Sequence, residues 1–302
     1  MVLEPENLYE VDSDVPDLTG AVLLHHFDGF MDAGSAGASL VEQLLSAGEN
    51  RVIARFDIDG LLDYRARRPP MTFEQDHWAD YQAPELVVRL LHDQVGTPFL
   101  LLTGPEPDFR WEAFITAVRQ LVERWGVRLT IGIHGIPMGV PHTRPLGLTA
   151  HATRPDLVAD YRPMFSRVQV PGNVSSLLEL RLGESGHDAV GFAAHVPHYL
   201  VQSTYPAAAL VLLEALTQAT SLVLAPGALT ESSRRADAEI ARQVAESDQV
   251  AEVVAALEQQ YDAFTSAKEE DNLLLDPNDI PSAEELGAEL ERFLAEQQGK
   301  SD

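Results

Sequence analysis

Short apolar runs alternate with helical patterns along most of this chain, and this alternation constrains the fold more than any other feature of the sequence. The run AVLLHHF at residues 21–27 is bounded by Gly and by Asp-Gly, which is typical of a buried strand. Further strands are predicted at residues 51–58, 98–103, 127–133, 146–150, 165–170 and 188–194. The pattern predicts an α/β fold, a three-layer α/β/α sandwich with a mostly parallel sheet.

The predicted helices carry apolar residues at three- and four-residue spacing. In the clearest of them, at residues 110–125, Trp111 and Phe114 begin a continuous apolar stripe. Residues 84–94 have a similar pattern, with Pro84 at a position that the first turn of a helix tolerates. The same spacing predicts further helices at residues 34–47, 175–184 and 205–218.

The sequence changes character near residue 228, beyond which no strand pattern follows and acidic residues outnumber basic ones. We therefore expect three parts: an acidic N-terminal segment (1–19), an α/β/α main domain (20–227) and a C-terminal helical region (228–302). Because short helices are seldom stable alone in water, the helical region must dock on the sandwich or on a neighbouring subunit.

Two apolar stripes define the helices of this C-terminal region. A loop is predicted between them at residues 269–280, and Ser282 with Glu285 forms a capping box for the last helix. The first stripe consists of Val250, Val253, Val254, Leu257, Tyr261 and Phe264, and the second of Leu286, Leu290, Phe293 and Leu294.

Composition excludes several classes of function. The formal net charge is −26, so nucleic acid and anionic membranes are not expected as partners. There is no cysteine, which excludes disulfides, thiolate metal sites and cysteine nucleophiles. We see neither a signal peptide nor an apolar run long enough to cross a membrane, and we expect a cytoplasmic protein.

Polar and glycine-rich turns follow four of the predicted strands, at residues 28–37, 103–106, 134–137 and 195–199. Because ligands of open α/β sheets bind outside the carboxyl ends of the strands, we expect any ligand to lie where these turns converge. The candidate ligand-binding residues are Asp28, Asp32, Gly34, Ser35, His134, His195, His198 and Tyr199. The alternative is that these groups only satisfy one another and the turn backbone.

More specific chemistry is weakly indicated. Ser35 lies in a sequence similar to a nucleophile elbow, but spacing identifies no base for it. His195 and His198 are three residues apart, and we predict no metal and no cofactor there. The basic cluster DYRARRPP at residues 63–70 could hold an anion, although internal pairing with the many carboxylates is the simpler interpretation.

Five separated motifs resemble the proteasome assembly chaperone 2 family in its actinobacterial branch, over about residues 20–295. In order they are FDGFMDAGSAGASL, DIDGLLDYRARRPPMTF, LLLTGPEPDFRWEAF, GIHGIPMGVPHTRP and GFAAHVPHYLVQSTYPAAALVLLEAL. The resemblance implies a sandwich similar to nucleoside phosphorylases, and it transfers no catalytic residue. Relatives that dock on the proteasome often end in a hydrophobic residue, a tyrosine and one more residue. This sequence ends Lys300-Ser301-Asp302, so we expect that docking tail to be missing.

Two functions remain open from the sequence. The first is a non-enzymatic assembly or interaction protein, which the resemblance and the lack of a complete catalytic set favour. The second is a small-molecule-binding protein or hydrolase-like enzyme that uses the strand-end residues. In either case we expect a homo-oligomer, with a trimer as the first guess, and a possible protein partner.

Overall fold

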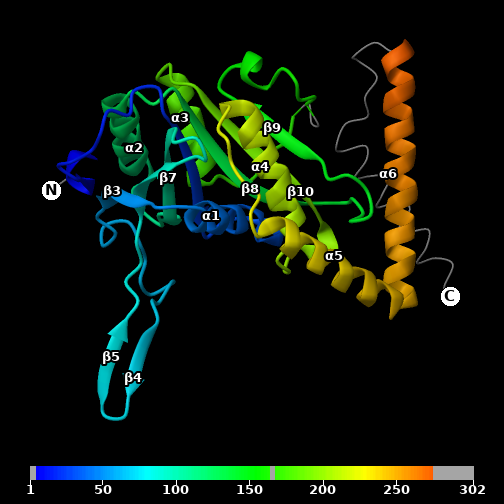
Figure 1. The fold of residues 1–302 in the computed structure, drawn as a ribbon, viewed down its shortest axis with the longest axis horizontal. Helices are drawn as coiled ribbons and strands as arrows, with labels where there is room; N and C mark the ends of the chain where they lie inside the picture. The colour runs from blue at the N-terminus through cyan, green and yellow to red at the C-terminus, as the bar shows by residue number, and fades with distance from the viewer. Residues whose placement is uncertain (1–4, 164–166, 275–302) are drawn as a thin grey trace.

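A computed structural model describes residues 5–163 and 167–274 of the chain. Its centre is an eight-stranded sheet in the order β1-β3-β6-β7-β2-β8-β10-β9 (Figure 1). Helices on both faces complete the α/β/α sandwich, which confirms the predicted fold class. The strands of this sheet are β1 (Tyr9–Val11), β2 (Val22–Asp28), β3 (Arg51–Phe56), β6 (Val87–His92), β7 (Pro98–Pro105), β8 (Leu129–Met138), β9 (Leu148–Ala152) and β10 (Ala189–Pro197).

The parallel part of the sheet is its centre. Strands β7, β2, β8 and β10 lie side by side and run in the same direction. Strands β6, β3 and β1 continue the sheet on one side, and β9 closes it on the other, all with antiparallel pairing. The sheet is therefore mixed, and the carboxyl ends of its four parallel strands share one edge.

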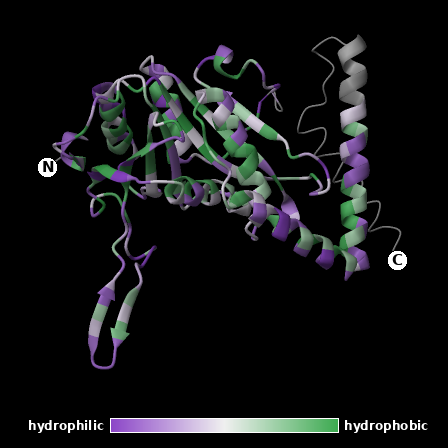
Figure 2. Cartoon of the chain, viewed as in Figure 1, coloured by the Kyte–Doolittle hydropathy of each residue, from purple (hydrophilic) through white to green (hydrophobic). Residues whose placement is uncertain are grey.

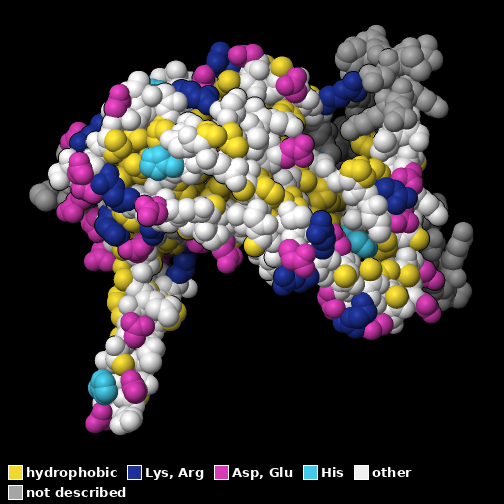
Figure 3. Space-filling view, in the orientation of Figure 1, with side chains coloured by type: hydrophobic (Ala, Val, Ile, Leu, Met, Phe, Trp, Pro, Cys, Tyr) yellow, Lys and Arg dark blue, Asp and Glu magenta, His cyan; other side chains and the backbone are white. Residues whose placement is uncertain are grey.

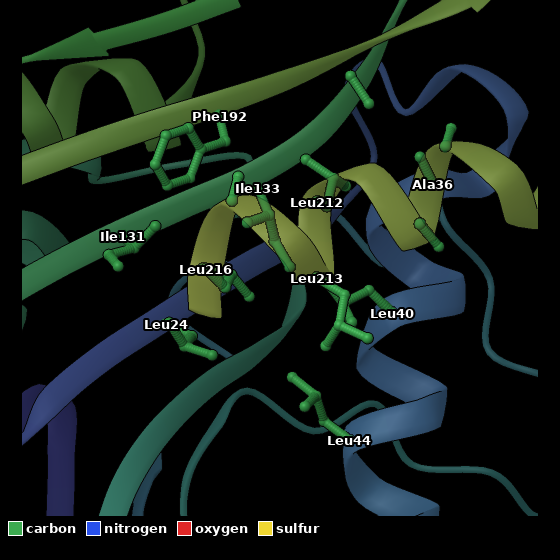
Figure 4. Close-up of a cluster of buried hydrophobic side chains, with 14 of the residues drawn as sticks. Leu24, Ala36, Leu40, Leu44, Ile131, Ile133, Phe192, Leu212, Leu213 and Leu216 are labelled. Atoms are coloured by element: carbon green, nitrogen blue, oxygen red, sulfur yellow. The ribbon is translucent and has the colours of Figure 1, made fainter. Parts of the chain in front are cut away.

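Two helices cover each face of the sheet. Helices α1 (Ala36–Ser46) and α4 (Pro206–Thr220) pack on one face, and α2 (Trp111–Trp125) and α3 (Val174–Glu184) on the other. Side chains of a strand alternate between the faces, so Leu24 joins the α1 and α4 layer while Leu23 joins the α2 and α3 layer. Figure 4 shows the first layer, where Leu24, Leu40, Leu44, Ile131, Ile133, Phe192, Leu212, Leu213 and Leu216 converge.

Helix α2 shows how the sequence pattern becomes packing. Its apolar stripe is buried, with Phe114 fully inaccessible and Val118 nearly so, while Arg119 lies on the outer face and pairs with Glu123. Gly126 ends the helix in a left-handed conformation, with its N–H donated to the last turn. Each fully buried large apolar side chain stabilises the fold by about 1.5–3 kcal/mol, so this stripe fixes the helix on the sheet.

The prediction of a helix at residues 84–94 is wrong, because the structure has strand β6 there, between β3 and β7. The apolar pairs Val87-Val88 and Leu90-Leu91 fit a helical spacing, but they equally fit a strand buried on both faces. Arg89 between the pairs reaches Asn50 with its guanidinium, at 3.2 Å. Pairing with two neighbouring strands therefore overrides the local pattern.

Two further expectations need correction. The strand predicted at residues 165–170 is absent from residues 167–170, and residues 164–166 lie outside the described part of the chain. Residues 269–274 of the predicted loop belong instead to helix α6 (Asp248–Leu274), and residues 275–280 lie outside the described part of the chain. The predicted second stripe and its capping box also lie outside the described residues.

A two-stranded hairpin projects from the sandwich as an arm (Figure 1). It consists of β4 (Met71–Glu74) and β5 (His77–Tyr81), which pair only with each other. Every residue of both strands is exposed. Hydrophobic and hydrophilic residues alternate along the arm (Figure 2), and nothing in the sequence pattern had predicted it.

The C-terminal helices extend from the other end of the molecule (Figure 1). Helix α5 (Leu229–Ala245) packs on α4 through its buried first turn, and α6 turns away from it. An ion-pair cluster fastens α6 to the connection between β8 and β9, where Arg144 contacts Asp262 at 2.7 Å and Glu258 at 3.2 Å. Within residues 5–163 and 167–274, no helix is long and apolar enough to cross a membrane.

Candidate functional site

The turn after β2 is organised by Asp32. One carboxylate oxygen accepts N–H groups from Gly37 at 2.9 Å and Gly135 at 2.8 Å, and the other accepts from Ala38 at 3.0 Å. The carboxylate thus caps the first turn of α1 and ties it to β8, and the positive end of the helix favours its charge. In this arrangement the carboxylate of Asp32 is a structural clamp, because it holds α1 and β8 together through hydrogen bonds to their backbones.

His26 lies beside this clamp, buried on the α1 face of the sheet. Its Nδ1 donates to the Ile133 carbonyl at 3.1 Å, which leaves Nε2 3.7 Å from the Asp28 carboxylate and 3.8 Å from that of Asp32. Burial alone would lower the pKa of His26, but the two carboxylates and the carbonyl raise it above its usual value. The sequence analysis missed His26, because it lies within an apolar run.

The opposite face of the same strands holds different histidines. Burial, together with the neighbouring His151, lowers the pKa of His134 to about 4. His134 lines a small cavity of about 30 Å³, enough for about one water molecule. Polar groups around it include the buried Glu106, which accepts the first N–H of α3 from Val174 at 2.8 Å.

His195 and His151 both have side-chain partners. The His195 ring contacts the Thr149 hydroxyl at 2.8 Å across the β9–β10 pair, and Gly147 leaves room for the ring. His151 contacts Glu179 of α3 at 2.9 Å. Burial opposes the charge on His151, but Glu179 raises its pKa above the usual value.

Tyr199 and His198 lie in the short helical turn after β10 (His198–Leu200). The Tyr199 oxygen accepts the backbone N–H of His142 at 2.9 Å and contacts the His142 ring at 2.7 Å. His198 is exposed and packs edge-on against the Tyr199 ring at 5.4 Å. Tyr199 therefore ties the turn after β10 to the connection between β8 and β9, on which α6 docks.

Gly34 and Ser35 form the turn into α1 with left-handed backbones, at φ 65° and 49°. A side chain at residue 34 would meet Val196 and Tyr205, so glycine suits the close approach there. Left-handed backbone at a serine occurs in nucleophile elbows. However, the histidine on this face, His26, directs its free nitrogen toward Asp28 and Asp32. No serine nucleophile with its base is assembled here.

The sheet divides the predicted site in two. Asp28 and Asp32 lie with His26 on the α1 face, whereas His134 and His195 lie on the α3 face, because strand side chains alternate. No pocket of the described residues is lined by all four, although His26 lines the small cavity beside His134. Ligand binding by any of the eight candidates stays a prediction, and no cluster of metal-ligating residues occurs in the described residues.

The basic cluster at residues 63–70 is partly paired. Arg67 contacts the Asp108 carboxylate at 2.6 Å and the Asp28 carbonyl at 3.2 Å, so it links the turn after β2 to the turn after β7. The Tyr64 hydroxyl donates to Asp59 at 2.7 Å. Arg65 and Arg68 are exposed at the base of the arm and form no ion pair with the described residues.

Fold and site together define an α/β/α sandwich with a projecting arm and no assembled catalytic set among the described residues. The sequence profile of the PAC2 family matches residues 26–244. The chain therefore belongs to the PAC2 family, as its motifs predicted. No curated protein matches it.

Solved structures similar to this chain include two actinobacterial proteins of unknown function and a chaperone homologue. A Mycobacterium tuberculosis protein of unknown function is 49% identical, with a TM-score of 0.84 over 90% of this chain and 95% of its own. A Corynebacterium glutamicum protein of unknown function is 38% identical, with a TM-score of 0.81 over 85% and 97%. A proteasome-assembly chaperone homologue from M. tuberculosis is 23% identical, with a TM-score of 0.71 over 77% and 99%, and supports the fold alone.

Proposed function

We propose that this chain is a non-enzymatic assembly or interaction protein of the cytoplasm, and that it binds other proteins through the β4–β5 arm. The observation that carries this proposal is the exposure of large apolar side chains on the arm. Met71 is 51% exposed, Phe73 56%, Trp78 63% and Tyr81 47%. Such concentrations of apolar surface in a soluble domain are typical of interaction sites.

The arm receives few stabilising contacts from the rest of its own chain. Phe73 and Trp78 pack edge-on at 5.1 Å, but no third strand or helix covers them. An isolated two-stranded hairpin is marginally stable in water. Figure 3 shows hydrophobic and acidic side chains along the projecting arm. A partner that covers its aromatic residues would stabilise the arm, which supports a binding role.

Family membership supports the same class of function. One relative with this fold is a proteasome-assembly chaperone homologue, and assembly chaperones act by binding protein subunits. We propose a protein partner for this chain on the same basis. Whether that partner is a proteasome subunit is an outcome of the experiment below.

We further propose that the chain self-associates, with a trimer as the working guess. The arm carries Glu74, Asp76 and Asp80 and no arginine or lysine, whereas Arg65 and Arg68 at its base have no ion pair among the described residues. If the arms of two copies cross, the acidic residues of one arm would lie close to Arg65 and Arg68 of the other copy. Such complementarity would offset part of the repulsion between two chains of net charge −26.

The test is a double substitution in the arm, Phe73→Ser with Trp78→Ser. Sedimentation equilibrium should show a self-dissociation constant at least about tenfold higher, since buried aromatic residues dominate interfaces. Pull-down from native lysate with mass spectrometry should show the loss of stoichiometric partners.

The matched control is Val95→Ser, which removes an exposed apolar side chain from a different turn and should change neither result. A wild-type chain that is monomeric at micromolar concentration, or partners that survive the double substitution, would contradict the proposal.

A further inference from the structure

A groove of about 510 Å³ runs along α1, between this helix and strands β2 and β7. This volume is within the range of small-molecule sites. No arginine or lysine of the described residues lines it. Its apolar wall consists of Ala38, Val41 and Leu45, and its polar groups are His26, Asp28, Glu42, Ser46 and Thr103.

The apolar wall is built by one side of α1. Ala38, Val41 and Leu45 follow one another at steps of three and four residues, so they form a stripe. At 1.5 Å per residue this stripe is about 10 Å long. The groove can therefore hold an extended apolar stem along the helix.

One end of the groove carries two unused hydrogen-bond acceptors. His26 is only 6% exposed, and its bond to the Ile133 carbonyl requires the proton of the neutral ring to be on Nδ1. In the neutral ring the lone pair of Nε2 therefore lies beside the Asp28 carboxylate, which lines the same groove, and no donor among the described residues satisfies it. The Asp28 carboxylate is 73% exposed and stands 3.7 Å from this nitrogen, which is longer than a direct hydrogen bond.

We propose that this groove binds a primary ammonium group on an unbranched apolar stem. The ammonium group, which has three donors and no acceptor, donates to the Asp28 carboxylate and to His26 Nε2. The stem lies on Val41 and Leu45, and the Glu42 carboxylate at the rim adds negative potential. Asp32 is not needed as a ligand, because its two oxygens already accept three backbone N–H groups.

Binding at this site is linked to a proton on His26. The negative groups facing His26 are Asp28, Asp32 and Glu42, the histidines His25 and His134 lie close by, and Arg67 contacts the Asp28 backbone. The carboxylates raise the pKa of His26, so its ring is partly protonated near neutral pH. A bound ammonium must displace that proton. Affinity therefore rises with pH until His26 is fully neutral.

The test uses n-hexylamine as the probe, titrated into the full chain at pH 6, 7 and 8 and followed by NMR of the histidine rings. The amine stays charged over this range, since its pKa is similar to the 10.4 of lysine. Hexylamine should shift the His26 resonances and bind more tightly at pH 8 than at pH 6. Neutral hexanol and anionic hexanoate should bind at least about fivefold more weakly.

Asp28→Asn should weaken hexylamine binding about fivefold, the upper end for a partly exposed ion pair. Glu252→Gln, which makes the same change in net charge on α6, should leave binding unchanged. His26→Asn should abolish the pH dependence. Because His26 is buried, that variant can disturb the fold, and the exposed Asp28 keeps the proposal testable.

The ammonium can come from a free amine or from a lysine side chain of a protein. A comparison of butylamine with lysine that is acetylated on its α-amino group and carries a C-terminal methylamide distinguishes these sources, because this lysine keeps its side-chain ammonium. Binding of either compound supports the shared chemistry. Equal affinity for hexanol and hexylamine, an unchanged affinity in Asp28→Asn, or affinity that falls with rising pH would overturn the proposal.

Discussion

His25 and His26 are neighbours in strand β2, yet the fold places them in opposite environments. His25 lies on the α3 face, where burial and the nearby histidines lower its pKa to about 3. His26 lies on the α1 face, where two carboxylates raise its pKa above the usual 6.5. One step along a strand thus changes a histidine that stays neutral into one that is readily charged.

The cause is the alternation of side chains across the sheet. On the α3 face, Gly132 of the next strand leaves a recess for the His25 ring, and Ser175 of α3 lies 3.4 Å from its Nδ1. No carboxylate is among the groups that act on this ring. On the α1 face, Asp28 and Asp32 stand close to His26. Residue type alone therefore predicts neither charge state.

Among single substitutions, the largest expected effect comes from filling the recess on the α3 face. In Gly132→Ala the new methyl group would lie 2.8 Å from the His25 ring and 2.9 Å from the Ser175 hydroxyl, too close without a shift of both. Overpacking of this kind should lower the free energy of unfolding by about 1–3 kcal/mol. Urea unfolding measures the change.

The control for this change is Gly48→Ala, where a new methyl group meets nothing within 4 Å. Its free energy of unfolding should stay within about 0.5 kcal/mol of the unchanged chain. A Gly132→Ala chain as stable as this control would show that the recess does not hold the ring tightly.

The next effect is a loss of stability in acid. The pKa of His25 is about 3 and that of His134 about 4 in the folded chain, against 6.5 when unfolded. Below pH 6.5 the unfolded chain binds more protons than the folded one. Stability that is present above pH 6.5 is therefore lost as pH falls toward 4, by up to about 1.4 kcal/mol per pH unit for each histidine.

Urea unfolding at pH 7, 6, 5 and 4 measures this slope, and His25→Gln should make it shallower. His26 does not reverse this loss of stability in acid. Its pKa is raised in the folded state, so its stabilising effect is fully present below pH 6.5. Equal slopes for the variant and the unchanged chain would remove His25 from the explanation.

The smallest effect concerns His26 alone. Asp28→Asn removes one of its two nearby carboxylates, so the pKa of His26 should fall, and the fall should be small because Asp28 is 73% exposed and solvent screens its charge. NMR titration of the histidine rings measures the shift, and the pKa of His25 should not follow. Glu252→Gln is again the matched control, and an equal fall in that variant would mean that net charge sets the value.

The main elements of the sandwich could be predicted from the sequence because each carries its own periodicity. Helix α2 has its stripe, and the runs of β2, β7, β8 and β10 are continuous apolar segments between turn residues. Strand β6 could not be assigned, since two apolar pairs on either side of one arginine fit the spacing of a helix as well as that of a buried strand. The arm was not predicted either, because the alternation in its strands covers only 4 and 5 residues, and none of them is buried.

The polar groups at the strand ends could be predicted from the sequence, but not which of them lie together. Strand ends were expected to hold polar residues, and Asp28 and Asp32 do lie together beside the start of α1. Joining them to His134 and His195 ignored the face to which each side chain points. His26 was missed because it lies with His25 inside an apolar run, whereas the folded chain brings the carboxylates of Asp28 and Asp32 close to its ring.

The sequence by itself determined the class of fold and the family, because apolar periodicity and motif order are properties of the linear chain. Only the tertiary structure decided which histidine meets a carboxylate, which glycine makes room for a ring and which apolar residues stay exposed on the arm. These outcomes depend on contacts between segments far apart in the sequence. The ring of His26, for example, is held by Ile133, a residue of another strand.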